Sequence, residues 1–349
     1  MGAPAPAAPG TAPDPEEWLR LALTAPSRTT YQGQKTVIQW SGRTSHAAVV
    51  RVYHRPPAQT RIEYLASGAR SQRLVIDDGR SRWYYDPARR LAVREISSGT
   101  DGLPPTVNLH LLRRNYILQR GGVARVAGRE AVQLGLQPRY PGRPLLRLWI
   151  DRETGLILRL ERFDGRGHLE QLSTFTRVAY TPDLPAHLFA WRPPAGTRTS
   201  AAPSAERVPL DRLAARLGFP PLPLTPAQIP AGFVLESTAL LKVGRAQVGR
   251  LHYTDGLATL TVFQGRVAVV GGGRGRTADA WGEGAPLQEQ GGVRALSWQA
   301  HGRMFTLVSD LAPSEVLRIA RGLGYNSQAR SGVNLSRQAS YMKQAGSVY

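Results

Sequence analysis

The sequence predicts an α+β protein with two domains, each built around antiparallel β-sheet. Its 349 residues are long for one domain and suit two. Apolar and polar residues alternate along many short segments, which is the period of strands with one buried face. The 36 glycines and 27 prolines supply the turns that such a chain of strands requires, and 42% apolar residues suffice for a core.

One helix is expected before the strands begin. Asp14 suits an N-cap and Pro15 suits the first helical position, with acidic residues in the first turn. From Trp18 onward, apolar residues recur at helical spacing, and the helix should end before Pro26. Residues 1–13 are rich in Pro and Ala and are predicted to form a disordered tether.

The next part of the chain is predicted to be a β-meander crossed by one helix. Asp78-Gly79 tolerates positive φ at both turn positions and favours a hairpin. The apolar spacing over 106–119 predicts a helix that lies across the sheet, and strands resume after Gly121-Gly122. The predicted strands span residues 36–40, 47–54, 60–65, 73–77, 81–85, 91–95, 124–127, 130–136, 145–150, 156–163 and 169–178.

Changes in composition along the chain predict the limits of the two domains. Residues 192–208 are mostly Pro, Ala, Ser and Thr and are predicted to be a linker between domains at 14–191 and 209–325. Residues 326–349 are polar and predict a loose tail. The second domain is expected to hold helices at 210–218 and 314–323, and strands around 233–242, 247–254, 257–264, 266–270, 293–299 and 304–308.

Patterns that support catalysis or metal binding are missing from the sequence. The chain has no cysteine, which excludes a thiolate metal site and a cysteine nucleophile. It contains no G-x-S-x-G or H-E-x-x-H sequence. None of the seven histidines has another two, three or four residues away. The sequence therefore predicts a protein that is not an enzyme and has no catalytic residue, metal or cofactor.

The net charge of +20 comes almost entirely from arginine, since lysine occurs only at Lys35, Lys242 and Lys343. Such a charge can steer a protein toward phosphates, anionic lipid or an acidic partner. The alternative is a solvated surface that reflects coding bias, because the arginines are spread through the chain and form no dense cluster. No nucleic-acid partner is predicted.

Aromatic residues on the meander strands are the candidates for a ligand site. They could line a groove on a curved sheet that accepts an acyl chain or apolar peptide. The alternative is ordinary core packing. The six candidates are Trp40, Tyr64, Trp83, Tyr85, Trp149 and Phe175.

The sequence has no run of about 18 apolar residues that could span a bilayer. The Pro/Ala-rich start has neither the basic nor the apolar region of a signal peptide. It has the composition of a tether that follows a removed signal or a lipid anchor, so we expect an exported protein.

Several short motifs resemble one known family. The strand–turn–strand at 148–159 and the exit segment at 185–196 resemble LolA/LolB lipoprotein carriers. In the second domain, Ile229-Pro230-Ala231-Gly232-Phe233, the stretch 251–263 with its Tyr-x-Asp-Gly-Leu sequence, and 311–320 are similar to the MucB/RseB family of sigma-factor regulators. The resemblance covers roughly residues 15–325, and the Tyr-x-Asp-Gly-Leu stretch is its most specific part.

The resemblance implies a LolA/LolB-like half-barrel with helices on its concave face, followed by a smaller α+β domain. It implies a periplasmic protein that binds the extracytoplasmic domain of an anti-sigma factor and protects it from proteolysis until lipid or lipopolysaccharide releases it. The strong positive charge and the polar tail depart from the family pattern. The implied partner surface contains His252, Tyr253, Asp255 and Phe263.

The sequence is compatible with three functions. The first is a sensor of envelope stress that binds an anti-sigma factor. The second is a periplasmic carrier of lipid or lipoprotein that uses the groove of the first domain. The third is binding of a polyanion or anionic glycolipid through arginine, which is compatible with the other two. A homo-oligomer is also compatible with the sequence.

Overall fold

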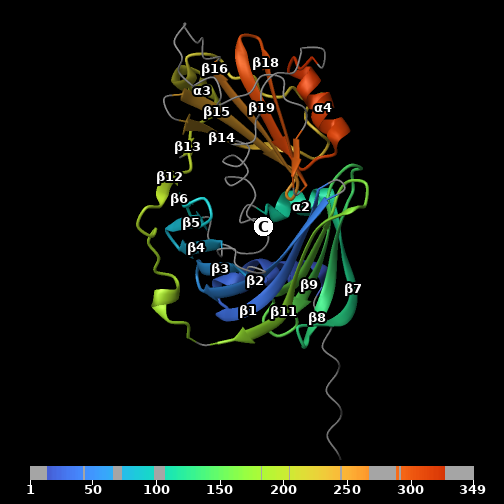
Figure 1. Cartoon of the computed structure of the whole chain (residues 1–349). Coiled ribbons are helices and arrows are strands. Elements are labelled where there is room, and N and C mark those ends of the chain that lie inside the picture. Colours follow the sequence, from blue (N-terminus) through green and yellow to red (C-terminus); the bar gives the residue numbers. More distant parts are fainter. Residues whose placement is uncertain are drawn as a thin grey trace, which may run out of the picture.

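The computed structural model shows two sheets joined at one rim, and all but one of their strand pairs are antiparallel (Figure 1). It describes residues 14–41, 44–65, 73–97, 107–181, 183–203, 205–243, 246–266, 288–290 and 292–326. The predicted tether at 1–13 and the predicted tail from residue 327 onward lie outside the described residues, as does most of the predicted strand at 266–270.

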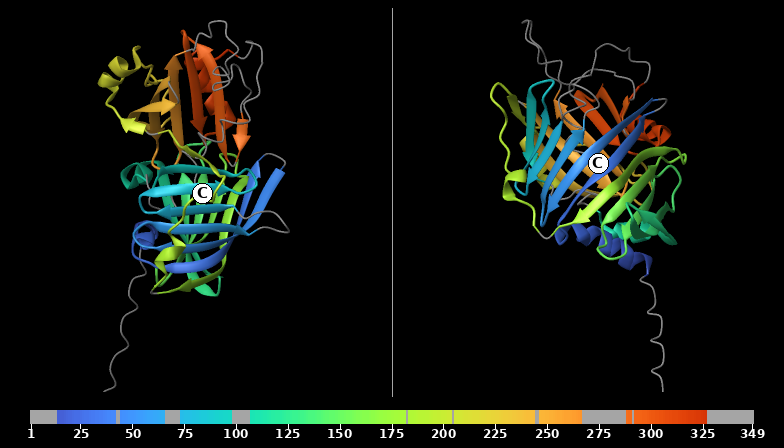
Figure 2. Two further views of the ribbon diagram at one scale, coloured as in Figure 1. Left: turned by 60° about the vertical axis from the view of Figure 1, so that its left-hand side comes forward. Right: turned by 60° about the horizontal axis from the view of Figure 1, so that its bottom comes forward.

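The first sheet has twelve strands in the order β12-β6-β5-β4-β3-β2-β1-β11-β10-β9-β8-β7. It curves strongly, as the two views of Figure 2 show, which confirms the predicted half-barrel. Its strands are β1 (Tyr31–Ser41), β2 (Thr44–Arg55), β3 (Gln59–Leu65), β4 (Leu74–Asp78), β5 (Ser81–Asp86), β6 (Leu91–Ile96), β7 (Tyr116–Val126), β8 (Arg129–Pro138), β9 (Leu145–Asp151), β10 (Ile157–Phe163), β11 (Leu169–Tyr180) and β12 (Arg198–Ala201).

Local sequence rules account for the tight turns of this sheet. At the predicted hairpin, Gly79 has φ +88° and its N–H donates to the Asp77 carboxylate (2.8 Å). The Asp78 carboxylate accepts the N–H of Ser81 (2.7 Å), so both acidic side chains fix the turn. The prediction of a hairpin at this position is confirmed.

Helix α1 (Pro15–Thr24) packs on one face of the first sheet. The side chain of Asp14 accepts the N–H of Glu17 (2.7 Å), so the predicted N-cap is confirmed. Trp18 and Leu19 are buried among apolar side chains of β8 and β9. This packing closes the core of the first domain on that side.

The helix predicted over 106–119 is wrong in its second half. Helix α2 (Leu109–Asn115) ends at Asn115, and the chain continues directly as strand β7. Tyr116 pairs with Pro138 and Leu118 with Leu136, so pairing with β8 overrides the helical spacing of the apolar residues. Arg113 and Arg114 occupy the last turn of the helix, where basic residues oppose its dipole.

The second sheet has seven strands in the order β13-β14-β15-β16-β19-β18-β17. Helices α3 (Leu210–Leu217) and α4 (Pro313–Gly322) pack on its larger apolar core, as predicted for both helices. The strands are β13 (Ala205–Arg207), β14 (Val234–Val243), β15 (Ala246–Thr254), β16 (Thr259–Arg266), β17 (Gln288–Gln290), β18 (Val293–Ala300) and β19 (Arg303–Ser309).

The segment predicted as a linker contains two short strands. Strand β12 runs parallel to β6 in the first sheet, and β13 runs antiparallel to β14 in the second. Each sheet therefore holds one end of the connection. Within the described residues, no helix is long and apolar enough to cross a membrane.

Removal of the Leu19 side chain tests the packing of α1 on the sheet. Leu19→Ala should lower the free energy of unfolding by about 2–5 kcal/mol, because Leu19 is 1% exposed and the cavity cannot fill completely. Urea denaturation followed by tryptophan fluorescence measures the loss. Leu23→Ala, a half-buried position on the same helix, is the control and should cost less. Equal losses would contradict the packing of Leu19 between α1 and the sheet.

Candidate functional site at the junction of the two sheets

The turn between β15 and β16 forms the centre of the junction. One carboxylate oxygen of Asp255 accepts the N–H groups of Leu257 (3.0 Å) and Ala258 (2.7 Å), which closes the turn. The Thr254 hydroxyl donates to the carbonyl oxygen of Ala258 (2.9 Å). The Tyr-x-Asp-Gly-Leu sequence is therefore a self-capped turn with a defined shape.

This turn inserts into the first domain. Gly256 has φ +103°, and a Cβ at this position would lie 2.5 Å from the backbone nitrogen of Leu112 in α2. Glycine is thus required both by conformation and by the close approach of the two backbones. The next residue, Leu257, is 4% exposed and belongs to the same apolar cluster as Trp18. A residue of the second domain completes the core of the first.

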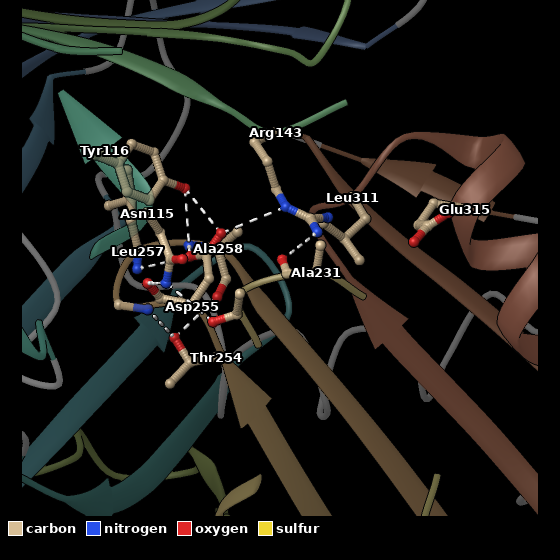
Figure 3. Close-up of polar contacts among 12 residues, drawn as sticks. Asn115, Tyr116, Arg143, Ala231, Thr254, Asp255, Leu257, Ala258, Leu311 and Glu315 are labelled. Atoms are coloured by element: carbon tan, nitrogen blue, oxygen red, sulfur yellow. Dashed lines mark hydrogen bonds and ion pairs between the residues drawn. The ribbon is translucent and has the colours of Figure 1, made fainter. Parts of the chain in front are cut away.

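The end of α2 and the start of β7 hold the turn from the other side (Figure 3). The Asn115 side-chain amide donates to the backbone carbonyl oxygens of Asp255 (2.7 Å) and Gly232 (2.9 Å). The Tyr116 hydroxyl donates to the carboxylate of Asp255 (3.2 Å). Both side chains are buried, so these contacts form away from water.

Arg143 supplies the cation of this cluster. Its Nε lies 3.5 Å from the Asp255 carboxylate, and its guanidinium donates to the carbonyl oxygen of Ala231 (3.0 Å) and lies over the ring of Phe233. Burial raises the pKa of Asp255 to about 6, although the backbone N–H groups of the turn and Arg143 act in the opposite direction. Burial and the nearby Asp255 also raise the pKa of Tyr116, which keeps the hydroxyl protonated as a donor.

Two crossed ion pairs lie beside the turn. Arg162 of the first sheet pairs with Asp310, which directly follows β19 of the second sheet (2.6 Å), and Glu170 of the first sheet pairs with Arg294 of the second (3.2 Å). All four side chains are at most 16% exposed. Each sheet contributes one cation and one anion, so the contacts specify one orientation of the sheets.

This arrangement is suited to holding two domains together. The Asp255 carboxylate is fully buried, accepts hydrogen bonds from three donors and lies beside the Arg143 guanidinium. No group of three or more His, Asp or Glu side chains that could hold a metal exists in the described part of the chain.

A small depression opens at the surface of the junction. It has a volume of about 210 Å³ and combines residues of the first domain with the segment that leads into β14. Arg114 and Val234 are exposed at its edge, and Val234 is one of the four large apolar side chains that are exposed in the described part of the chain. The lining residues are Leu111, Arg114, Asn115, Tyr140, Gly232, Phe233 and Val234.

The four residues predicted as a partner surface lie mostly inside the protein. Tyr253 is 1% exposed and accepts the N–H of Leu224 (2.9 Å), Asp255 is 0% exposed, and Phe263 is 9% exposed. These three side chains offer no surface in this arrangement, which corrects the prediction. The β-strand alternation turns Tyr253 inward, and the junction covers Asp255.

His252 is the half-buried member of that set. Its Nδ1 lies 2.8 Å from the Thr261 hydroxyl, and its Nε2 lies 3.7 Å from the carboxylate of Glu236. Burial and the nearby Arg250 lower the pKa of His252 to about 4, so the imidazole is neutral at neutral pH. His252 remains a candidate for partner contact.

Cross-strand pairing shows which face of the first sheet each of the six aromatic groove candidates lies on. Phe175 pairs with Lys35, Lys35 with Val50, and Val50 with Tyr64, so Phe175 and Tyr64 share one face of the first sheet. Trp40 lies an odd number of residues from Lys35 on the same strand and therefore faces the other way.

The other three candidates also lie on the face opposite to Tyr64 and Phe175. Trp149 pairs with Arg159, whose guanidinium lies over its ring, and Trp83 and Tyr85 pack against Trp191. The six side chains do not line one groove, because the two-residue period of a strand divides them between two faces.

Sequence reasoning missed most residues of the junction. Asn115, Tyr116, Arg143 and Arg162 have no local motif, and their partners lie more than 80 residues away along the chain. Only the turn at Asp255 carried a signal, since an Asp-Gly dipeptide after a strand predicts a tight turn.

The fold and the junction define a class of protein: a curved half-barrel sheet with a smaller sheet docked on its rim through a buried polar turn. Residues 14–191 match the profile of the MucB/RseB N-terminal domain, which is half of the chain. The chain belongs to the MucB/RseB family. No curated protein matches it in a sequence search.

Three solved structures share the fold over both sheets. A Pseudomonas aeruginosa MucA/MucB complex is 21% identical with a TM-score of 0.58, covering 88% of this chain and 97% of the matched one. A structure of MucB in complex with MucA(peri) is 22% identical with a TM-score of 0.57 and the same coverage. A structure of MucB is 21% identical with a TM-score of 0.55, covering 89% and 98%.

Substitution of Asp255 tests the electrostatics of the junction. The pKa of Asp255 is raised in the folded protein, so the folded state binds its proton more tightly than the unfolded state does. The titration of Asp255 should therefore lower the free energy of unfolding by about 2 kcal/mol as pH rises from 4 to 7, and Asp255→Asn should lack this component. Urea denaturation of both proteins across this range measures the difference, and a difference that does not change with pH would contradict the assignment.

Substitution of Arg162 tests the contribution of the crossed ion pairs to stability. Arg162→Met should cost about 3–5 kcal/mol of unfolding free energy, because Asp310 stays buried without its cation. Addition of Asp310→Asn should recover part of the loss, since Asn can still accept the N–H of Thr259. Arg152→Met removes an exposed pair with Glu130 and should cost much less. If the two losses simply add, the pair is not coupled.

Proposed function

We propose that this protein is a non-catalytic extracytoplasmic regulator that binds the extracytoplasmic domain of an anti-sigma factor. The observation that carries the proposal is membership of the MucB/RseB family. It is supported by the likeness of both sheets to MucB structures, two of which contain MucA.

The geometry of the junction suits a binding protein. The buried turn and the crossed ion pairs fix the two domains relative to each other, so a surface composed of both is formed before the partner arrives. The depression beside Asn115 is such a surface, with exposed Arg114 for a carboxylate and Val234 for an apolar side chain. We propose that a segment of the anti-sigma factor contacts it.

We also propose an extracytoplasmic location, namely the periplasm. Family membership supports it. The absence of cysteine is compatible with an oxidising compartment because no thiol can mispair. A fusion of the precursor to alkaline phosphatase should be active outside the cytoplasm.

A lipid or anionic glycolipid is the signal that we propose for release of the partner. The face of the first sheet opposite the helices pairs cations with aromatic rings, since Arg159 lies over Trp149 and Arg147 over Phe163. Rings and guanidinium groups together suit an acyl chain with a phosphorylated headgroup. The same observation supports a carrier of lipid or lipoprotein as the alternative function, and native mass spectrometry without bound lipid would count against both.

Affinity purification from the native organism tests the main proposal. The full-length protein should recover a membrane-anchored anti-sigma factor, and titration calorimetry with its exported domain should give a defined affinity. Arg114→Glu and Val234→Asp should weaken that affinity at least about tenfold without change of fold. Arg177→Glu, an exposed arginine on β11, is the matched control. Recovery of no anti-sigma protein would refute the proposal.

A further inference from the structure

The outer edge of strand β7 differs from the other sheet edges of the protein. Among the described residues, the first sheet ends in β12 and β7, and the second in β13 and β17. Three of these edge strands have only three or four residues, whereas β7 has eleven. Very short edge strands are a common protection against unwanted pairing, so β7 is the edge that lacks this protection (Figure 1).

The surface of β7 is open along most of its length. Residues 119–125 are seven consecutive exposed positions, and only Tyr116 and Val126 at the two ends are buried. Ile117 is 40% exposed and Val123 is 52% exposed, which makes two of the four large apolar side chains most open to water in the described chain members of this one strand. An open edge with apolar side chains is where an extended segment of another chain can add as a strand.

One of the two glycines of this strand, Gly122, is consistent with close approach by another backbone. Pairing with β8 shifts register between Arg120 and Val123, so Gly121 and Gly122 lie in a bulge. A Cβ at Gly122 would meet no atom within 4 Å, and its φ is not in the left-handed region. The packing of this chain therefore does not require glycine at 122. Glycine inside a strand often marks a place where a second backbone comes near.

The charge of β7 indicates what kind of segment fits. The strand carries Arg120 and Arg125 and no acidic residue, and Arg114 lies just before it. Glu130, which pairs with Arg125 across the strands, also forms an ion pair with Arg152. A second copy of the chain would bring the arginines of both edges together, which is unfavourable. An acidic strand would pair with them.

We propose that the outer edge of β7 binds an extended, acidic segment of a partner protein, which adds to the first sheet as a thirteenth strand. Main-chain hydrogen bonds supply the affinity, and Arg120 and Arg125 select for carboxylates. The bulge divides the edge into two pairing stretches, residues 116–120 and 123–126. Only features of the β7 edge support this proposal, and it does not require that the partner is an anti-sigma factor.

Two synthetic ten-residue peptides test the proposal on the intact protein. One alternates glutamate with valine and the other alternates lysine with valine. The glutamate peptide should bind, should slow amide hydrogen exchange in β7, and should lose affinity as salt increases. The lysine peptide should not bind. Slowed exchange at β12 or β17 instead of β7 would overturn the proposal.

A charge reversal separates edge recognition from general attraction to a basic protein. Arg120→Glu/Arg125→Glu should weaken binding of the glutamate peptide at least about tenfold and should allow the lysine peptide to bind. Arg177→Glu/Arg192→Glu makes the same change in net charge at exposed positions outside β7 and should leave the preference for glutamate intact. If both double variants behave alike, or if sedimentation shows pairing of two copies through β7, the proposal is wrong.

Discussion

The structure depends on a carboxylate that lies away from water. Asp255 is fully buried, and burial of a charge is costly unless hydrogen bonds and a cation compensate it. Two backbone N–H groups come from its own turn, and the Tyr116 hydroxyl and the Arg143 guanidinium come from the first domain. The second domain thus satisfies its most demanding group only when it is docked.

The same constraint explains why the two domains share a core. The turn that presents Asp255 also places Leu257 among the side chains that α1 and α2 cover. Glycine at 256 lets the turn approach α2 closely enough for this contact. Polar and apolar contacts therefore act at one point, and the orientation of the sheets follows from it.

The sequence predicted what local rules control. The cap at Asp14 and the hairpin at Asp78-Gly79 depend on residues within a few positions of one another, and both predictions are confirmed. The helix over 106–119 was wrong in its second half because its partner strand lies at 129–138, beyond any local window. The contacts across the junction could not be predicted, because Asn115 and Asp255 are 140 residues apart and no spacing rule joins them. The Tyr-x-Asp-Gly-Leu stretch was correctly singled out, but burial gives it a different role from the one predicted.

The short strands at the two ends of the connection limit how far the domains can ever separate. Ala201 ends β12 in one sheet and Ala205 begins β13 in the other, so four Cα steps join two fixed points. Fully extended, four residues span at most about 14 Å. The connection therefore allows little separation, because a wide opening of the two sheets would require β12 or β13 to detach from the strand with which it pairs.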